Sequence, residues 1–368
     1  MFLKVAFTAF GRPELSVPAG SVENGGRPRG SPGACRRGRY RCRVDSVELG
    51  LLQALQIDGR VAFSLVAEVL GVSDQTVARR YQALRAAGAV HVVGVTLPEA
   101  VGEETWLVRV GCAPGTADRL AQTLAGRPET SWVHVASGGA EIGCMVRTPA
   151  EAATSSVLTR LPRTSPVTRV SAHCVVHVFF GGPASPLTKT GPLTAEQAGR
   201  LRPAEAATAS TDEPVALTDG DRALLAELGR DGRTGFRELA AATGWSQTTV
   251  RRRLAELRRA GVLYFDVDYE PALLGMRTTA SLWLSVAPRH LAAAGAALAG
   301  HAEVSFAAAT TGPSNLYVTV QCRNPHALYT YLTGPLATLP GVSAVETAPL
   351  MRTAKQAKIA ALPVRDGK

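Results

Sequence analysis

The stretch GWSQTTVRRRLAELRRAG, residues 244–261, decides how this sequence is interpreted, because it places five arginines within nine positions between regularly spaced apolar residues. In a helix, Val250, Leu254 and Leu257 share one face and pack inward. At about 100° per residue, the outward face then carries Thr248, Arg251, Arg252, Ala255 and Arg259. Such a face is either a solvated surface or one that binds a polyanion.

A second copy of this stretch lies upstream in the chain. Residues 58–90 align with residues 231–263 without a gap, and 15 of the 33 positions are identical. Upstream of both, Leu51, Leu52 and Leu55 correspond to Leu224, Leu225 and Leu228. The sequence therefore predicts two similar units in tandem.

Each unit has the spacing of a helix-turn-helix motif. A short apolar helix precedes a DGR turn, and a second helix ends at Gly71 or Gly244. Ser73 and Ser246 are placed to cap a third helix, which ends at Gly88 or Gly261. In such a motif the N-terminal part of the last helix enters the DNA major groove.

We expect the third helices to bind double-stranded DNA. The candidates for contact with base edges are Gln75, Thr76, Arg79, Thr248 and Arg252, because arginine can bond bidentately to guanine. Arg80, Arg251 and Arg253 are predicted to position the phosphate backbone, although Arg253 lies at the edge of the buried face and is also suited to pair with an acid. The complete predicted interface comprises Ser73, Gln75, Thr76, Arg79, Arg80, Ser246, Gln247, Thr248, Thr249, Arg251, Arg252 and Arg253.

The second half of each unit alternates between strand and helix patterns in the order βαββαβ, a ferredoxin-like arrangement. In the first unit the predicted elements are 105–112, 116–126, 131–137, 141–147, 149–161 and 171–180. In the second unit they are 280–287, 290–299, 303–310, 315–321, 326–339 and 342–350. The predicted fold class is α+β, with two tandem units that each join a winged-helix-like helix-turn-helix to a ferredoxin-like domain.

Together these features resemble the leucine-responsive regulator/AsnC (Lrp/AsnC) family of transcription factors. The resemblance covers about residues 45–180 and 215–355, and the segments LLQALQIDGR, GVSDQTVARRYQALRAAG, LLAELGRDGR and GWSQTTVRRRLAELRRAG carry it. It implies a βαββαβ domain that assembles oligomers and senses a small ligand, usually an amino acid, near the loop between its second and third strands. The corresponding effector candidates are Gly138, Gly139, Glu141, Thr311, Gly312 and Asn315.

The two loops differ in a way that bears on ligand binding. The family commonly has Asp at the last loop position, where this chain has Glu141 in one unit and Asn315 in the other. Asn315 weakens the expectation of amino-acid sensing in the second unit, because an α-amino group favours a carboxylate. A plain hairpin turn explains the glycines equally well.

The net charge of +10 is unevenly distributed, since residues 1–43 contribute +7 (nine basic and two acidic residues). We expect residues 1–43 to be a disordered basic tail that is either an arm touching phosphates or, preferably, a spurious upstream extension, because the patterned sequence begins at Val44. The expected domains are 44–98 and 217–270 for the helix-turn-helix units, and 102–180 and 277–355 for the ferredoxin-like domains. A linker at 181–216 and a tail at 356–368 complete the chain.

No apolar run is long enough to predict a membrane span, and we expect a cytoplasmic, nucleoid-associated protein without a cofactor or metal. The cysteines outside the tail stand singly, which favours buried reduced thiols. His173 and His177 are interpreted as structural or solvent-facing residues.

The leading interpretation is a sequence-specific, ligand-responsive transcriptional regulator that is not an enzyme and that acts as a homo-oligomer or an intramolecular pseudo-dimer. Two alternatives use the same scaffold: a sirohaem decarboxylase-like enzyme, and an oligomerisation module without DNA binding. The arginine-rich helix at 250–259 argues against the enzyme, and the capping serines and exposed arginines retained in both copies argue against the oligomerisation module.

Overall fold

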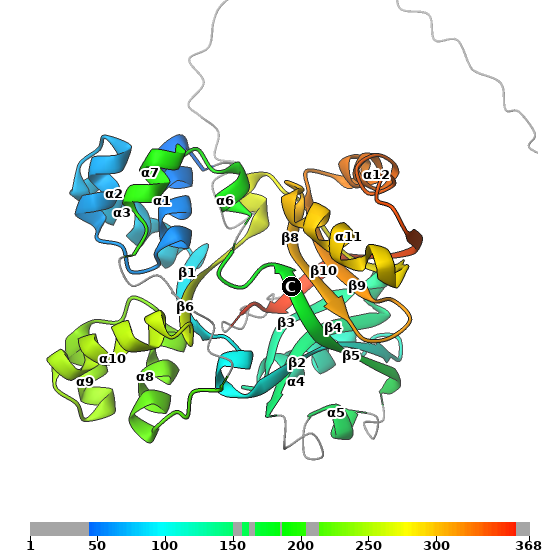
Figure 1. Ribbon diagram of the computed structural model, residues 1–368, viewed down its shortest axis with the longest axis horizontal. Coiled ribbons are helices and arrows are strands. Elements are labelled where there is room, and N and C mark those ends of the chain that lie inside the picture. Colours follow the sequence, from blue (N-terminus) through cyan, green and yellow to red (C-terminus); the bar gives the residue numbers. More distant parts are fainter. Residues whose placement is uncertain (1–43, 150–156, 162–165, 185, 204–212, 358–368) are drawn as a thin grey trace, which may run out of the picture. The chain divides into compact units, whose positions relative to one another are not determined.

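The computed structural model describes residues 44–149, 157–161, 166–184, 186–203 and 213–357 (Figure 1). The predicted tail at 1–43 and part of the helix expected at 149–161 lie outside these residues. Within the described residues no helix is long and apolar enough to cross a membrane.

Each helix-turn-helix unit consists of three helices that surround a leucine-rich core. The first unit contains α1 (Ser46–Ile57), α2 (Phe63–Leu70) and α3 (Asp74–Ala86), and the second contains α8 (Asp219–Arg230), α9 (Phe236–Thr243) and α10 (Gln247–Arg259). Gly71 and Gly244 end α2 and α9 in the left-handed conformation, with φ of 67° and 73°. A residue with a Cβ would be strained there, so glycine sets the angle between the two helices of each motif.

A strand follows each three-helix unit, and the two strands pair with each other. Strands β1 (Val90–Thr96) and β6 (Leu263–Tyr269) form a two-stranded antiparallel sheet in which Val93 faces Asp266. Val93 and Asp266 are separated by 173 residues, the offset of the sequence repeat, as are Arg60 and Arg233. The two units are therefore related by a pseudo-two-fold axis through this sheet, like the subunits of a homodimer.

The DGR turns form a reciprocal contact across the same axis. Arg60 donates hydrogen bonds to the carbonyls of Gly232 (2.6 Å) and Thr234 (3.0 Å). Arg233 donates to the corresponding carbonyls, those of Gly59 (2.7 Å) and Val61 (3.0 Å). Each guanidinium also lies over a phenylalanine of the opposite unit, Phe236 or Phe63.

Two further ion pairs repeat this exchange, since Arg85 pairs with Asp231 at 2.5 Å and Arg258 pairs with Asp58 at 3.0 Å. Burial and the nearby Arg233 charge lower the pKa of Arg60 to about 10. The carbonyls and acids therefore hold together two cations that repel each other. This arrangement links the two helix-turn-helix units into one body.

The segment predicted as a linker packs against the first unit instead of only connecting the halves. It contains α6 (Leu187–Thr190) and α7 (Ala195–Arg200), the latter within the range where a short helix was expected. Leu187 and Leu201 are buried in the helix-turn-helix core, at 1% and 2% exposure. The apolar residues interspersed among its Pro, Gly and Thr explain why this segment folds against α1 and α2.

The ferredoxin-like halves have the predicted βαββαβ order. The first contains β2 (Glu103–Cys112), α4 (Ala117–Ala125), β3 (Thr130–Ala136), β4 (Glu141–Pro149), α5 (Val157–Arg160) and β5 (Val167–Phe180). The second contains β7 (Thr278–Val286), α11 (Pro288–Gly300), β8 (Val304–Thr310), β9 (Leu316–Cys322), α12 (Pro325–Thr333) and β10 (Val342–Lys355). Short 3₁₀ turns lie at Glu99–Val101, Ser137–Gly139 and Pro271–Leu274.

The strands of both halves close into one barrel in the order β10-β3-β4-β2-β5-β8-β9-β7. Closure depends on the long last strand of each half. The first part of β5 pairs with β2, and its continuation from Val175 pairs with β8. In the same way, β10 pairs with β7 as far as Pro349 and with β3 from Leu350.

Alternation along the strands divides the barrel into an outer and an inner layer. On β2, Val108, Val110 and Cys112 pack beneath α4, and on β7, Leu282, Leu284 and Val286 pack beneath α11 and α12. The intervening residues, including Leu107 and Trp283, point to the barrel interior. The two helix-covered layers thus enclose a barrel interior that both halves line with apolar and polar side chains.

The predicted α+β class and tandem organisation are confirmed. The strand at 90–96 was not predicted, although HVVGVT is apolar and β-branched. Instead of a wing within each unit, these strands form a sheet between units.

The reciprocal contacts of Arg60 and Arg233, which we call the reciprocal clamp, give a stability prediction. Arg233→Ala removes two charge-assisted hydrogen bonds to buried carbonyls, and we expect it to lower the free energy of unfolding by about 3 kcal/mol. The matched control is Arg230→Ala, because Arg230 is exposed and, among the described residues, pairs only with Glu227 on its own helix; it should change stability by less than about 0.5 kcal/mol. Urea unfolding followed by circular dichroism measures both, and equal effects would contradict the clamp.

Candidate nucleic-acid interface

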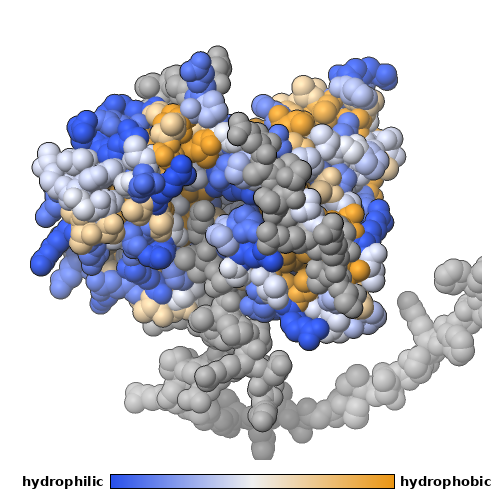
Figure 2. Space-filling view, turned by 90° about the horizontal axis from the view of Figure 1, so that it is seen from below, coloured by the Kyte–Doolittle hydropathy of each residue, from blue (hydrophilic) through white to orange (hydrophobic). Residues whose placement is uncertain are grey.

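The last helices of the two motifs, α3 and α10, bury one face and expose the other. Val77, Tyr81 and Leu84 of α3 are buried, as are Val250, Leu254 and Leu257 of α10. The opposite face exposes Gln75, Arg79, Gln82, Gln247, Thr248, Arg251, Arg252 and Arg259. The helical units accordingly present a largely hydrophilic surface, at the left of Figure 2.

The three consecutive arginines of α10 have different environments. Arg251 is exposed and its guanidinium lies 4.4 Å from the centre of the Phe236 ring. Arg252 is exposed and pairs with Glu256 at 3.1 Å, a surface contact that a stronger anion can displace. Both side chains can therefore reach a polyanion without disturbing the core.

Arg253 instead belongs to the internal structure of its unit. Its Nε and one amino group donate to the two carboxylate oxygens of Asp221, at 2.6 and 2.9 Å. The Asp221 side chain is fully buried, and the bonds from Arg253 lower its pKa to about 2. The same carboxylate closes the capping box of α8 with Thr218.

Arg80 makes the corresponding contacts in the first unit. It pairs with Asp45 and with Glu48, the residue that corresponds to Asp221. Arg80 and Arg253 thus tie the last helix of each motif to the first, as the edge position of Arg253 suggested. By contrast, Arg79 is exposed and forms no ion pair within the described part of the chain.

The predicted serine and threonine residues form the helix caps. The Ser73 hydroxyl accepts the Thr76 N–H at 3.2 Å, and the Ser246 hydroxyl accepts the Thr249 N–H at 3.1 Å. The hydroxyls within each pair also lie 2.9 Å apart. These interactions confirm the predicted N-caps and fix the start of each helix, where Gln75, Gln247 and Thr248 extend outward.

The two exposed faces differ at corresponding positions. Asp74, Gln75 and Ala78 in α3 correspond to Gln247, Thr248 and Arg251 in α10, whereas Arg79 corresponds to Arg252. The acidic Asp74 and the absence of an arginine at position 78 make α3 the less basic helix. One chain therefore presents two related but unlike helices.

The loops predicted to sense an effector have most of their polar groups engaged within the barrel. Asn315 accepts the Val286 N–H at 2.9 Å and donates to the Val286 carbonyl at 2.8 Å. Thr311 bonds through its hydroxyl to the Cys174 N–H, and Gly312 approaches the His173 ring so closely that a Cβ would lie 2.5 Å from Nδ1. In the first unit Glu141 pairs with Arg109 at 2.7 Å, and Gly138 and Gly139 adopt positive φ. The effector role of these residues stays a prediction.

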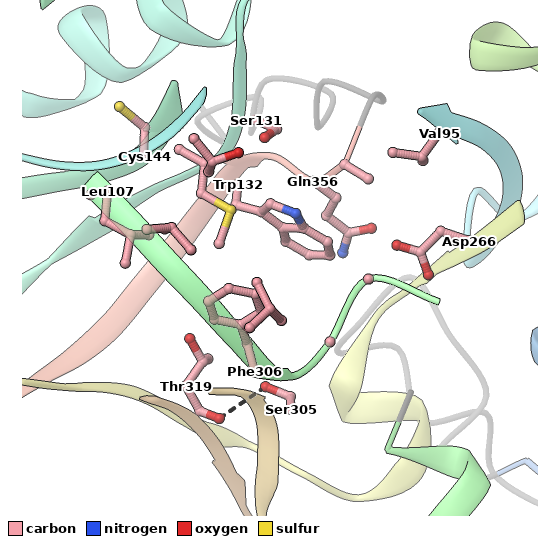
Figure 3. A pocket seen from close by; sticks show the side chains of 18 of the residues that line it. Val95, Leu107, Ser131, Trp132, Cys144, Asp266, Ser305, Phe306, Thr319 and Gln356 are labelled. Atoms are coloured by element: carbon pink, nitrogen blue, oxygen red, sulfur yellow. Dashed lines mark hydrogen bonds between the residues drawn. The ribbon is translucent and has the colours of Figure 1, made fainter. Parts of the chain in front are cut away.

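A cavity of about 810 Å³ lies between the β1–β6 sheet and the barrel interior. Trp132, Phe306, Asp266 and Gln356 project into it in Figure 3. The sequence analysis did not identify this site, because its lining comes from many strands and no local motif marks it. Trp132 was recognisable only as part of a predicted strand.

The remaining chemically reactive side chains have structural environments. His173 is buried, and its Nδ1 lies 2.8 Å from the Thr311 carbonyl, whereas His177 is exposed. Cys112, Cys144, Cys174 and Cys322 are free thiols. Among the described residues no cluster of three or more His, Cys, Asp or Glu side chains could hold a metal ion.

Two capped helix-turn-helix motifs paired across a pseudo-two-fold axis, each followed by a ferredoxin-like domain, define a DNA-binding transcriptional regulator. The comparisons agree: the AsnC-type helix-turn-helix domain matches residues 44–85 and 217–258, and the Lrp/AsnC ligand binding domain matches residues 279–359. The protein belongs to the Lrp/AsnC family.

Single-unit relatives match less than half of this chain. Regulatory protein AsnC of Escherichia coli strain K12 is 30% identical over 142 residues, which are 37% of this chain and 93% of that protein. The HTH-type transcriptional regulator FL11 of Pyrococcus abyssi is 27% identical over 143 residues, 39% of this chain and 94% of that protein. This chain thus contains two units where those regulators have one.

A solved structure matches most of the chain in fold. The siroheme decarboxylase NirDL aligns with a TM-score of 0.58 and 15% identity, covering 86% of this chain and 94% of that one. At this identity the likeness shows that both proteins share the tandem fold.

The buried ion pair gives a pH-dependent prediction. Asp221→Asn removes the buried carboxylate that pairs with Arg253 and leaves this arginine its contact with Glu256 of the same helix at 3.1 Å, so we expect a loss of about 3 kcal/mol in the free energy of unfolding at pH 7. The folded-state pKa of Asp221 lies below its ordinary value of 3.8. The contribution of this pair is therefore fully present above about pH 4 and is lost as the pH falls toward 2.

Urea unfolding of wild type and Asp221→Asn across this range measures the effect. The difference between them should be constant from neutral pH to about pH 5 and shrink below about pH 4. A difference that persists unchanged at pH 3 would contradict the assignment.

Proposed function

We propose that this regulator recognises two unlike DNA half-sites with a single chain. The observation that supports the proposal is the intramolecular pseudo-dimer, in which the β1–β6 sheet and the reciprocal Arg60 and Arg233 contacts hold α3 and α10 in one body. A homodimer repeats one recognition helix and reads a palindrome. Here the two helices differ at the positions that face outward.

We assign the DNA-contacting roles by whether a side chain is exposed and whether it already pairs with an acid of its own unit. Arg79 and Arg252 are equivalent, exposed and placed near the N-terminal half of their helices, so they are the candidates for guanine recognition, with Gln75, Thr76 and Thr248 beside them. Arg251 is suited to contact phosphate. Arg80 and Arg253 pair with acids at the start of the first helix of their own unit, so we assign them to the fold of each unit instead of to the interface.

We also propose that the protein acts as a regulator and not as a tetrapyrrole decarboxylase, although it shares the fold of NirDL. Uroporphyrin-type tetrapyrroles carry several carboxylates, and a pocket for them needs cationic partners. The cavity lining contains eight Asp or Glu residues and two arginines. Both arginines are paired, Arg109 with Glu141 and Glu346, and Arg147 with Glu103.

The two exposed arginines of α10 allow the contact classes to be separated. Arg252→Ala should relax base preference at one or two positions and cost about 1–3 kcal/mol on the specific site. Arg251→Ala should weaken binding to all sequences and reduce the salt dependence by about one phosphate. The control, Arg289→Ala, alters an exposed arginine of α11.

Fluorescence anisotropy with specific and random DNA over a salt series measures these effects. Equal losses on both DNAs for Arg252→Ala would assign Arg252 to phosphate contact. If the wild type shows no preference among genomic fragments, the proposed sequence recognition is wrong.

The unlike half-sites can be tested by making the helices alike. A triple variant carries Asp74→Gln, Gln75→Thr and Ala78→Arg. These substitutions give α3 the exposed N-terminal face of α10. Selection from a random DNA pool should yield a non-palindromic consensus for the wild type and a palindromic one for the variant. A palindromic wild-type consensus would indicate that two chains each use the same unit.

A further inference from the structure

The cavity is lined by residues of both halves of the chain, which are related by the pseudo-two-fold axis. Equivalent residues line it from both sides: Arg109 and Trp283 occupy corresponding positions on β2 and β7, since Arg109 pairs with Gly143 as Trp283 pairs with Tyr317. The β1–β6 sheet contributes Val95 and Asp268, which are also equivalent. A molecule in the cavity would touch both the helix-turn-helix sheet and the barrel.

Trp132 is held in this cavity by a strained backbone. Its φ is 51°, in the left-handed region that a bulky residue rarely adopts, and its side chain stays 39% exposed. The Trp132 N–H donates to the Gln356 carbonyl at 2.9 Å. Its own carbonyl lies 2.9 Å from Nδ1 of His134, which burial keeps neutral by lowering the pKa to about 4.

Gly143 makes this arrangement possible. A Cβ on Gly143 would lie 2.2 Å from Nε2 of His134, so only glycine leaves room for the ring that anchors Trp132. Strain of this kind persists where surrounding contacts enforce it, often at ligand sites. The indole is therefore displayed toward the cavity by a specific set of contacts.

Among the charged residues of the cavity wall, acidic ones predominate. The carboxylates of Glu141 and Glu103 are neutralised by arginines, but Asp266 has no ion pair within the described residues and accepts one hydrogen bond, from the Val267 N–H at 2.8 Å. Removal from bulk water raises the pKa of Asp266. A cation in the cavity would stabilise its ionised form.

Apolar and aromatic groups line the same cavity as this carboxylate. Phe306 occupies the position in the second unit that Trp132 has in the first, and Met145, Val95 and Trp283 complete an apolar lining. In Figure 3, Trp132 and Asp266 extend into the same space from different strands. Indole faces and carboxylates together are the groups that bind organic ammonium ions.

We propose that the cavity binds a small organic ammonium ion with an apolar body, whose charge lies toward Asp266 and whose body packs on Trp132 and Phe306. The volume of about 810 Å³ is within the range of small-molecule sites. We expect the ligand to be asymmetric, because equivalent positions of the two halves carry different residues. Met145 corresponds to Thr319, and Arg147 corresponds to Gln321.

The regulatory consequence rests on the proposed function. A ligand that contacts Val95 and Asp266 on one side and the barrel strands on the other would favour one placement of the β1–β6 sheet against the barrel. Because α3 and α10 are joined to this sheet, its placement affects how the two helices meet DNA.

Isothermal titration calorimetry of the full chain tests the ligand site without DNA. The probes are phenethylammonium and benzyltrimethylammonium, with 3-phenylpropionate as an anion of similar size. We expect saturable binding of the cations, no binding of the anion, and weakening by about tenfold in Asp266→Asn. Asp118→Asn, which alters an exposed carboxylate on α4, should leave the affinity unchanged.

Gly143→Ala provides a second variant, because it displaces His134 and releases Trp132 while leaving the charge of the cavity intact. It should weaken binding of both cations, and urea unfolding identifies any general loss of structure. Equal binding of cations and anion, no saturable cation binding, or an unchanged affinity in Asp266→Asn would overturn the proposal. Binding of iron uroporphyrin in this cavity would also overturn it.

Failure of the ligand site and failure of the proposed function are distinguishable. The calorimetric titration contains no DNA. If the protein binds the cations but does not select DNA sequences, the ligand site is supported and its proposed regulatory role is wrong. With DNA, phenethylammonium should change the affinity of the wild type and leave that of Asp266→Asn unchanged.

Discussion

The pairing of β1 with β6 is the constraint on which the rest of the structure depends. Neither strand has another strand as a partner among the described residues, so each forms its ladder of backbone hydrogen bonds with the other unit. The register places Val93 opposite Asp266, its own equivalent, and the DGR turns then meet with Arg60 and Arg233 exchanging carbonyl contacts. A single antiparallel pairing thus determines the relation of two DNA-binding motifs.

The barrel uses the same principle on a larger scale. The final strand of each half begins in its own sheet and continues into the other, which closes the barrel and leaves no strand edge exposed in it. In a homodimer every residue of such an interface occurs twice. Because both halves are encoded in one chain, equivalent positions can carry different residues. Arg109 and Trp283 are an example, and the Arg109 guanidinium lies 5.1 Å from the centre of the Trp283 ring.

The same divergence between equivalent positions occurs on the outward faces of the helices and in the cavity. The outward faces of α3 and α10 differ in charge, and the two sides of the cavity carry different side chains, with Trp132 and Arg147 from the first unit and Asp266 from the second. Conserved geometry maintains the two-fold arrangement, because the glycines, caps and ion pairs recur in both units. The side chains on the exposed faces of α3 and α10 and those that line the cavity differ between the units.

The sequence by itself determined the helices of both motifs, their serine caps and their βαββαβ order, because these depend on contacts between residues a few positions apart. The pairing of Arg253 with an acid was partly predicted, since this arginine lies at the edge of the buried face, but its partner Asp221 was not identified. Only the tertiary structure decided that residues 90–96 pair with a strand 173 residues away and that the predicted linker packs on α1. It also decided that Trp132, Asp266 and Phe306 meet in one cavity. Pairing between distant strands leaves no local periodicity, and a cavity formed by many strands has no motif in any of them.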